Sequence, residues 1–239
     1  MSLLDKIKTQ IQNLIGIANE KTGNADTDLT SAVNALVGGY GQSGGLQVIE
    51  FAQSWFDLFL NVTFEENAEI NILSKVAISN NMSGMFRQAK NVKKIKLSAA
   101  DFSTTNPIIA NYMFTGSQSV EVIDISGLKF QIGNAESVFQ SCDSLKKIIG
   151  IIDFSKALKI SNMFFGLVRL EEVRFEKETL SLSVSFAQSP LLSDVSIQSI
   201  IDGLATVETA QTLTLHADVK AKLTEAQISQ ITSKNWTLA

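Results

Sequence analysis

One spacing of apolar residues recurs through the middle of the chain. From Phe164, large apolar side chains follow at offsets +6, +9 and +11, with charged residues between them. The same offsets recur from four other phenylalanines, which are Phe86, Phe114, Phe139 and Phe186. Gly150, at +11 from Phe139, is the exception to this pattern. The anchors stand 28, 25, 25 and 22 residues apart, so the pattern indicates an internal repeat.

The offsets predict the structure of each repeat. Positions +9 and +11 alternate as one face of a short strand does, whereas the anchor and +6 lie upstream in a turn or irregular segment. A unit of this size cannot bury its own apolar face, so successive units must stack and share one core. We therefore expect an α+β solenoid of about five repeats, with the phenylalanines in a column. Burial of each phenylalanine contributes roughly 1.5–3 kcal/mol.

Four of these units resemble the BspA-like leucine-rich repeats. They read "NNMSGMFRQAKNVKKIKL", "ANYMFTGSQSVEVIDISGLKF", "ESVFQSCDSLKKIIGIIDF" and "SNMFFGLVRLEEVRF". The resemblance covers about residues 75–198. It implies a curved, right-handed solenoid with short strands on one face, and the sequence places this leucine-rich repeat domain in residues 47–239.

Both ends of this domain depart from the repeat, and we expect them to be caps. In the C-terminal cap, at about 199–239, "TLTLH" predicts a strand, and Thr224 is placed as the N-cap of a helix with Ile228 and Ile231 on one side. Trp236 and Leu238 then indicate a closing strand. Residues 47–78 are expected to cap the other end, and their aromatic side chains would fill it: Phe51, Trp55, Phe56, Phe59 and Phe64.

The first 37 residues predict a helical segment. Apolar residues recur at steps of three and four, the a and d spacing of a coiled coil, at Leu4, Ile7, Ile11, Leu14 and Ala18. Such a short helix is marginal alone, so its apolar stripe needs a partner. That partner is either a second helix of the same segment, as a hairpin, or another chain. The glycine-rich linker at 38–46 favours the second option, a homo-oligomer or attachment to a larger assembly.

This N-terminal segment, "LLDKIKTQIQNLIGIANEKTGNADTDLTSAVNALVGGYG", resembles the first segments of bacteriophage and prophage tail-associated proteins. The resemblance implies that the segment attaches to a virion part and that the remainder displays a binding module. It also implies assembly in the host cytoplasm and location in the phage tail. The N-terminus shows no pattern of a signal peptide.

Composition narrows the range of functions. A net charge of −4 disfavours nucleic acid as a partner, and we find no run of 18 apolar residues that predicts membrane insertion. The single cysteine, Cys142, is expected to be a buried structural thiol, and the single histidine, His216, a capping or surface residue. We find no catalytic motif and expect neither a metal nor another cofactor.

The strand positions between the core offsets predict a binding surface. If +9 and +11 face the core, then +8 and +10 face solvent. The expected surface comprises Lys94, Lys96, Val122, Asp124, Lys147, Ile149, Glu172, Arg174, Asp194 and Ser196. These columns predict a face that is basic at one end and acidic at the other. The alternative is a solvated sheet surface with charge pairs and no ligand.

Together these observations predict a non-enzymatic phage structural protein. Its head would attach to the tail or baseplate, and its repeats would present a recognition surface to a host-cell ligand or another virion protein. The alternative is a bacterial adhesin-like or scaffolding repeat protein outside a virion.

Overall fold

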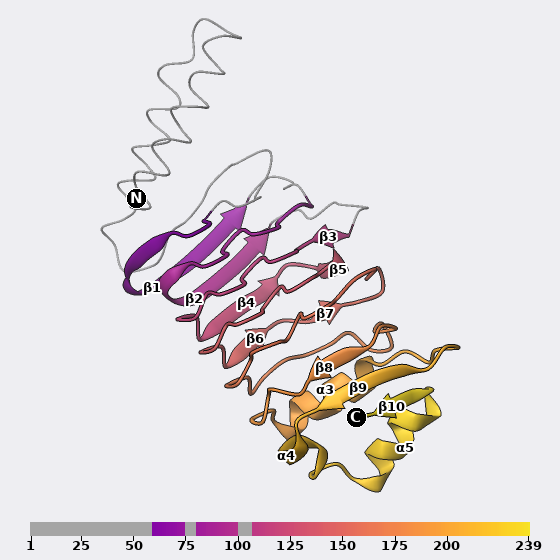
Figure 1. The fold of residues 1–239 in the computed structure, drawn as a ribbon. Coiled ribbons are helices and arrows are strands. Elements are labelled where there is room, and N and C mark those ends of the chain that lie inside the picture. Colours follow the sequence, from indigo (N-terminus) through magenta and orange to yellow (C-terminus); the bar gives the residue numbers. More distant parts are fainter. Residues whose placement is uncertain (1–58, 75–79, 100–106) are drawn as a thin grey trace, which may run out of the picture.

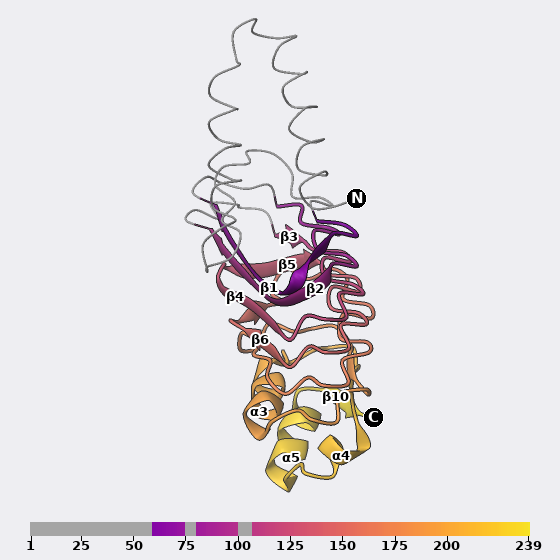
Figure 2. The same ribbon diagram turned by 90° about the vertical axis from the view of Figure 1, so that its left-hand side faces the viewer.

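Coils of the chain lie one above another along a single axis (Figures 1 and 2). The computed structural model describes residues 59–74, 80–99 and 107–239. The predicted helical segment at 1–37, its residues Leu4, Ile7, Ile11, Leu14 and Ala18, and the linker at 38–46 lie outside the described residues.

Three parallel sheets line the stack. The first has the order β1-β2-β4-β6, with strands at Thr63–Ser74, Lys90–Ala99, Val122–Gly127 and Lys147–Ile149. The second has the order β3-β5-β7, with strands at Ile108–Ile109, Phe130–Asn134 and Ile152–Asp153. The third has the order β10-β9-β8, with strands at Trp236–Leu238, Gln211–Leu215 and Val184–Phe186.

Residues at equal offsets from their phenylalanines lie side by side in the first sheet. Ile95 of β2 pairs with Ile123 of β4, which pairs with Ile148 of β6. All three occupy offset +9 and are buried. The predicted strand at this offset is therefore confirmed in these three units.

The expected phenylalanine column is present. Adjacent rings stack with their centroids 4.5–5.9 Å apart in the order Phe59, Phe86, Phe114, Phe139, Phe164 and Phe186. All six rings are at most 2% exposed. One aromatic ring from each successive coil thus forms the centre of the shared core.

Turn segments around these phenylalanines are also hydrogen-bonded from coil to coil, and they form a wall of the stack in addition to the sheets. The Phe86 amide donates to the Met113 carbonyl at 2.7 Å, and the Phe114 amide donates to the Val138 carbonyl at 2.9 Å. Around Phe86, Phe114, Phe139 and Phe164, the residues two before and two after the phenylalanine have positive φ, as Tyr112 and Gly116 do around Phe114. Because the sign of φ changes along the turn, every second amide points toward the next coil. These amides donate hydrogen bonds to carbonyls of that coil, much as the amides of a strand do.

Gly150 interrupts the repeat for a steric reason. Its φ is +113°, and an added Cβ would lie 2.9 Å from the Cγ1 atom of Ile125 in the preceding coil. Strand β6 ends just before it, and β7 begins at Ile152. A side chain at this +11 position would therefore clash where the chain turns from the first sheet to the second.

The N-terminal end of the described chain forms a further coil. Phe59 extends the phenylalanine column, and β1 pairs with β2 in parallel, with Ile70 opposite Ile95. Phe59 and Phe64 are buried as expected. Residues 59–74 thus pair as a repeat coil does, and the offsets did not identify this coil because two irregularities in β1, on either side of Ala68, shift its apolar positions out of the +9 and +11 spacing. Phe51, Trp55 and Phe56 lie outside the described residues.

The fifth predicted strand is wrong, because helix α3 (Asp194–Gly203) occupies its place. The Ser193 hydroxyl accepts a hydrogen bond from the Ser196 amide and caps the helix. The side chain of Val195, expected in the core, is 62% exposed, whereas that of Ser196, expected in solvent, is buried. A helix turns successive residues by 100° rather than 180°, so the period-2 assignment fails here.

The predicted strand, helix and closing strand of the C-terminal segment are present, and one further short helix was not predicted. Strand β9 covers "TLTL", and helix α5 (Glu225–Ser233) begins with a capping box between Thr224 and Gln227. Short helix α4 (Ala217–Lys220) has His216 as its N-cap, and the Nδ1 of His216 accepts a hydrogen bond from the Asp218 amide. Strand β10 closes the chain with Trp236 buried. On α5, Ile231 is buried but Ile228 is 39% exposed, so the buried side of the helix includes only one of the two isoleucines expected there.

Candidate binding surface

The outer side of the first sheet brings most of the expected binding residues into two rows. We call this surface the strand face; it comprises the outward residues of β1, β2, β4, β6 and the segment 171–174. Backbone register places Glu69, Lys94, Val122, Lys147 and Glu172 in one row. The second row follows the same register through Asn71, Lys96, Asp124 and Ile149, and Arg174 is the next residue in it.

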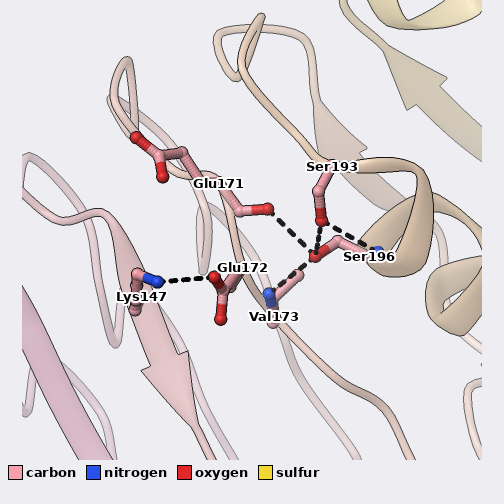
Figure 3. Close-up of polar contacts among 6 residues, drawn as sticks. All are labelled: Lys147, Glu171, Glu172, Val173, Ser193 and Ser196. Carbon is pink, nitrogen blue, oxygen red and sulfur yellow. Dashed lines mark hydrogen bonds and ion pairs between the residues drawn. The ribbon is translucent and has the colours of Figure 1, made fainter.

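Charged residues of the two rows pair across neighbouring coils. The Lys147 Nζ lies 2.6 Å from an oxygen of Glu172 (Figure 3), and the hydrogen bond from this ammonium raises the pKa of Lys147. The Lys96 Nζ lies 3.7 Å from Asp124, and the Lys94 Nζ lies 4.0 Å from Glu69. The sequence predicted a gradient from a basic to an acidic end, and these three pairs neutralise part of that charge between neighbouring coils.

A third row, at offset +7, was not predicted. The carboxylate of Glu121 on one coil lies 2.8 Å from Lys93 on the coil before and 2.8 Å from Lys146 on the coil after. Hydrogen bonds from the two ammonium groups lower the pKa of Glu121 to about 2. The alternation Lys93, Glu121, Lys146 was visible in the sequence at a constant offset, but the two-row assignment left this offset out.

Asp124 differs from its expected exposure. Its side chain is buried, and it accepts hydrogen bonds from the amide of Ser126 at 3.0 Å and from the Ser126 hydroxyl at 2.6 Å. Burial opposes ionisation, but these hydrogen bonds and the charge of Lys96 outweigh it and lower the pKa of Asp124. This carboxylate therefore serves the turn at the end of β4.

The C-terminal boundary of the strand face is a helix rather than another strand (Figure 3). The Ser196 hydroxyl donates to the Glu171 carbonyl at 3.0 Å and accepts from the Val173 amide at 3.1 Å. Ser196 is therefore not part of an exposed surface. Asp194, in the first turn of the helix, is exposed as expected.

Within the described part of the chain, three expected residues of the two rows have no charge pair. Val122 is half-buried, Ile149 is 40% exposed, and Arg174 is exposed. Ile151, which follows the Gly150 interruption, is 50% exposed and was not predicted. The repeat offsets gave no signal for Ile151, because it lies where the chain leaves the regular strand.

Cys142 lies inside the stack, away from the strand face. Its thiol donates to the Phe114 carbonyl of the preceding coil at 3.1 Å, and burial raises its pKa to about 12. The equivalent residue one coil earlier, Ser117, donates to the Phe86 carbonyl in the same way, at 2.5 Å. The expectation of a buried structural thiol is confirmed.

We also searched the described residues for membrane-spanning helices and metal sites, and we compared the chain with known proteins. Across the described ranges, we find no helix long and apolar enough to cross a membrane, and no cluster of three or more His, Cys, Asp or Glu side chains placed to hold a metal ion. Comparison of the chain with protein-family models, curated proteins and solved structures gives no match.

Proposed function

We propose that this chain is a leucine-rich repeat solenoid of the BspA-like kind and acts as a non-enzymatic binding protein of a phage tail. Its N-terminal segment attaches to the tail or baseplate and holds several copies together. Its strand face is directed to a host-cell ligand or to another virion protein. The family resemblances in the sequence support the virion setting, and the geometry of the strand face supports the binding role.

The observation that carries the binding role is the rigid spacing of the side-chain rows. Backbone hydrogen bonds join adjacent coils along the first sheet and along the turn wall, as from the Glu121 amide to the Lys93 carbonyl or from the Phe86 amide to the Met113 carbonyl. Outward side chains are thereby held at the spacing of strands in a sheet, about 4.8 Å. A surface ordered before binding loses less conformational entropy when a partner covers it.

Two preparations test the binding role, namely a cell-envelope fraction of the host cell and purified tail particles. The native chain is expected to cosediment with at least one of them in a saturable manner. Absence of saturable binding to both preparations contradicts the proposal. Tail genes on both sides of the coding gene would support the virion setting, whereas unrelated neighbours would count against it.

The role of the N-terminal segment has a separate test. Ile7→Lys with Ile11→Lys places charges on the predicted apolar stripe, and Gln10→Lys with Gln12→Lys places the same charges on the opposite side. In sedimentation velocity, the native chain and the glutamine variant are expected to run as oligomers and the isoleucine variant as a monomer. A monomeric native chain would refute the oligomer.

A further inference from the structure

Arg174 lies on the coil that follows two exposed isoleucines, Ile149 at the end of β6 and Ile151 shortly after it. The bridge between Lys147 and Glu172 places Ile149 beside Arg174, and the next bridge joins Ile152 to Phe175. Residues Gly150 and Ile151 are the extra residues between these two bridges, so Ile151 also lies next to Arg174. The two isoleucine side chains are 40% and 50% exposed.

The guanidinium of Arg174 is available for a partner. Within the described ranges it forms no hydrogen bond or ion pair, in contrast to five lysines on or beside the strand face that have a carboxylate within 4.0 Å: Lys93, Lys94, Lys96, Lys146 and Lys147. The carboxylate two residues before it, that of Glu172, is held by Lys147 at 2.6 Å. The N-terminal part of the face is thus neutralised internally, whereas this part has aliphatic surface and a cation that no described residue pairs with.

We propose that this part of the strand face binds a polypeptide, by pairing the Arg174 guanidinium with a partner carboxylate while aliphatic side chains of the partner cover Ile149 and Ile151. An arginine fork matches a carboxylate in two parallel hydrogen bonds. Apolar neighbours exclude water and strengthen such a pair. The proposal rests on the proposed function, since it names the chemistry of the ligand at the same face.

The apolar neighbours favour a polypeptide over a glycan. Sugar rings pack against the faces of aromatic side chains, and the large exposed aromatic residues of the described chain, Tyr112 and Phe165, lie in the turn segments rather than on the strand face. Isoleucine offers no flat ring for stacking but does fit the branched aliphatic side chains of a protein. An acidic residue next to aliphatic residues is therefore the complementary pattern.

The test uses full-length protein and the same two probes, the cell-envelope fraction and the tail particles. Three variants are compared with the native chain: Arg174→Lys, Arg174→Glu and the matched control Arg169→Glu. Arg169 is also exposed, but it lies outside the strand face. Each probe is used untreated, after protease digestion, after periodate oxidation of glycans, and after its carboxylates are converted to amides with carbodiimide and ethanolamine. Circular dichroism and the melting temperature establish that each variant is folded.

The expected result is specific to the arginine and to the probe carboxylates. Arg174→Glu weakens binding by about tenfold or more, the order seen for a central arginine in an interface, and Arg174→Lys weakens it less because charge remains but the fork is lost. Arg169→Glu binds as the native chain does. Protease and amidation abolish binding, and periodate leaves it unchanged.

Other outcomes overturn the inference. Unchanged binding by Arg174→Glu, or equal loss in Arg169→Glu, leaves the binding role standing but removes Arg174 from it. Binding that survives protease or amidation, or that periodate abolishes, replaces the polypeptide carboxylate with a different ligand chemistry. If the native chain binds neither probe, the proposed function and this inference both fail.

Discussion

At the residue scale, charged side chains on the strand face act first on the neighbouring coils. Glu121 is the clearest case, because one carboxylate joins Lys93 and Lys146 from the coils on either side. Single exposed ion pairs contribute little to stability, but a carboxylate shared by two lysines forms a small network. These residues therefore set the register of the coils, and the outward residues without such pairs are the ones free for recognition.

Substitution Glu121→Gln tests whether the ion pairs of Glu121 with Lys93 and Lys146 stabilise the fold, because it changes how stability depends on pH. The folded-state pKa of about 2 lies below the ordinary value of 4.5, so the carboxylate stabilises the fold above pH 4.5 and loses that effect as pH falls toward 2. After allowance for solvent screening, we expect the native chain to lose about 1 kcal/mol more than the variant between pH 6 and pH 2.5. Urea unfolding at both pH values measures the difference. Equal losses would contradict the network.

At the element scale, helix α3 ends the first sheet by supplying side-chain hydroxyls in place of a strand. Ser196 accepts from the Val173 amide, and Ser199 accepts from the Phe175 amide at 3.0 Å. Gly203 completes this side of the helix, because an added Cβ would lie 2.7 Å from the Cβ of Phe175. Small residues at spacings of three and four thus let the helix approach the strand closely. The last strand edge is covered and cannot pair with another chain there.

The double substitution Ser196→Ala with Ser199→Ala tests how much the two hydroxyls of α3 contribute to stability. Two strand amides would lose their acceptors, at a cost of about 1–3 kcal/mol each in the free energy of unfolding. Ser229→Ala, in an exposed position of α5, is the matched control and should cost less than about 0.5 kcal/mol. Urea unfolding gives the free energies. A double variant as stable as the control would show that the hydroxyls do not hold the strand edge.

At the scale of the whole molecule, the phenylalanine column couples the coils. Phe139 contacts the rings of Phe114 and Phe164, at 5.6 and 5.9 Å between centroids, and is fully buried. A gap at this level would separate the N-terminal coils from the C-terminal ones. Because each coil contacts mainly its neighbours, a central ring influences both halves of the stack.

Substitution Phe139→Ala should therefore lower the free energy of unfolding by about 3–5 kcal/mol. Phe165→Ala removes a neighbouring aromatic ring that is 50% exposed, and it should cost less than half as much. Denaturant unfolding followed by circular dichroism measures both. Similar losses for the two variants would contradict the central role of the column.

Much of the interior could be predicted from the sequence, because burial repeats at fixed offsets. The column from Phe86 to Phe186, the core strand positions Ile95, Ile123 and Ile148, and the capping role of Thr224 all followed from local patterns. The candidate site was predicted less well. Alternation identified Ile149 and Arg174, but it could not show that Asp124 is buried or that Ile151 is exposed beside them.

The sequence by itself determined the spacing of the core, since an apolar residue at a constant offset has to be buried in every coil. Only the tertiary structure decided which charges remain available and where the sheet ends. An ion pair depends on the distance between side chains of different coils, and the Ser196 and Ser199 hydroxyls replace a strand only because α3 packs against Val173 and Phe175. These contacts join residues more than twenty positions apart, so no local pattern encodes them.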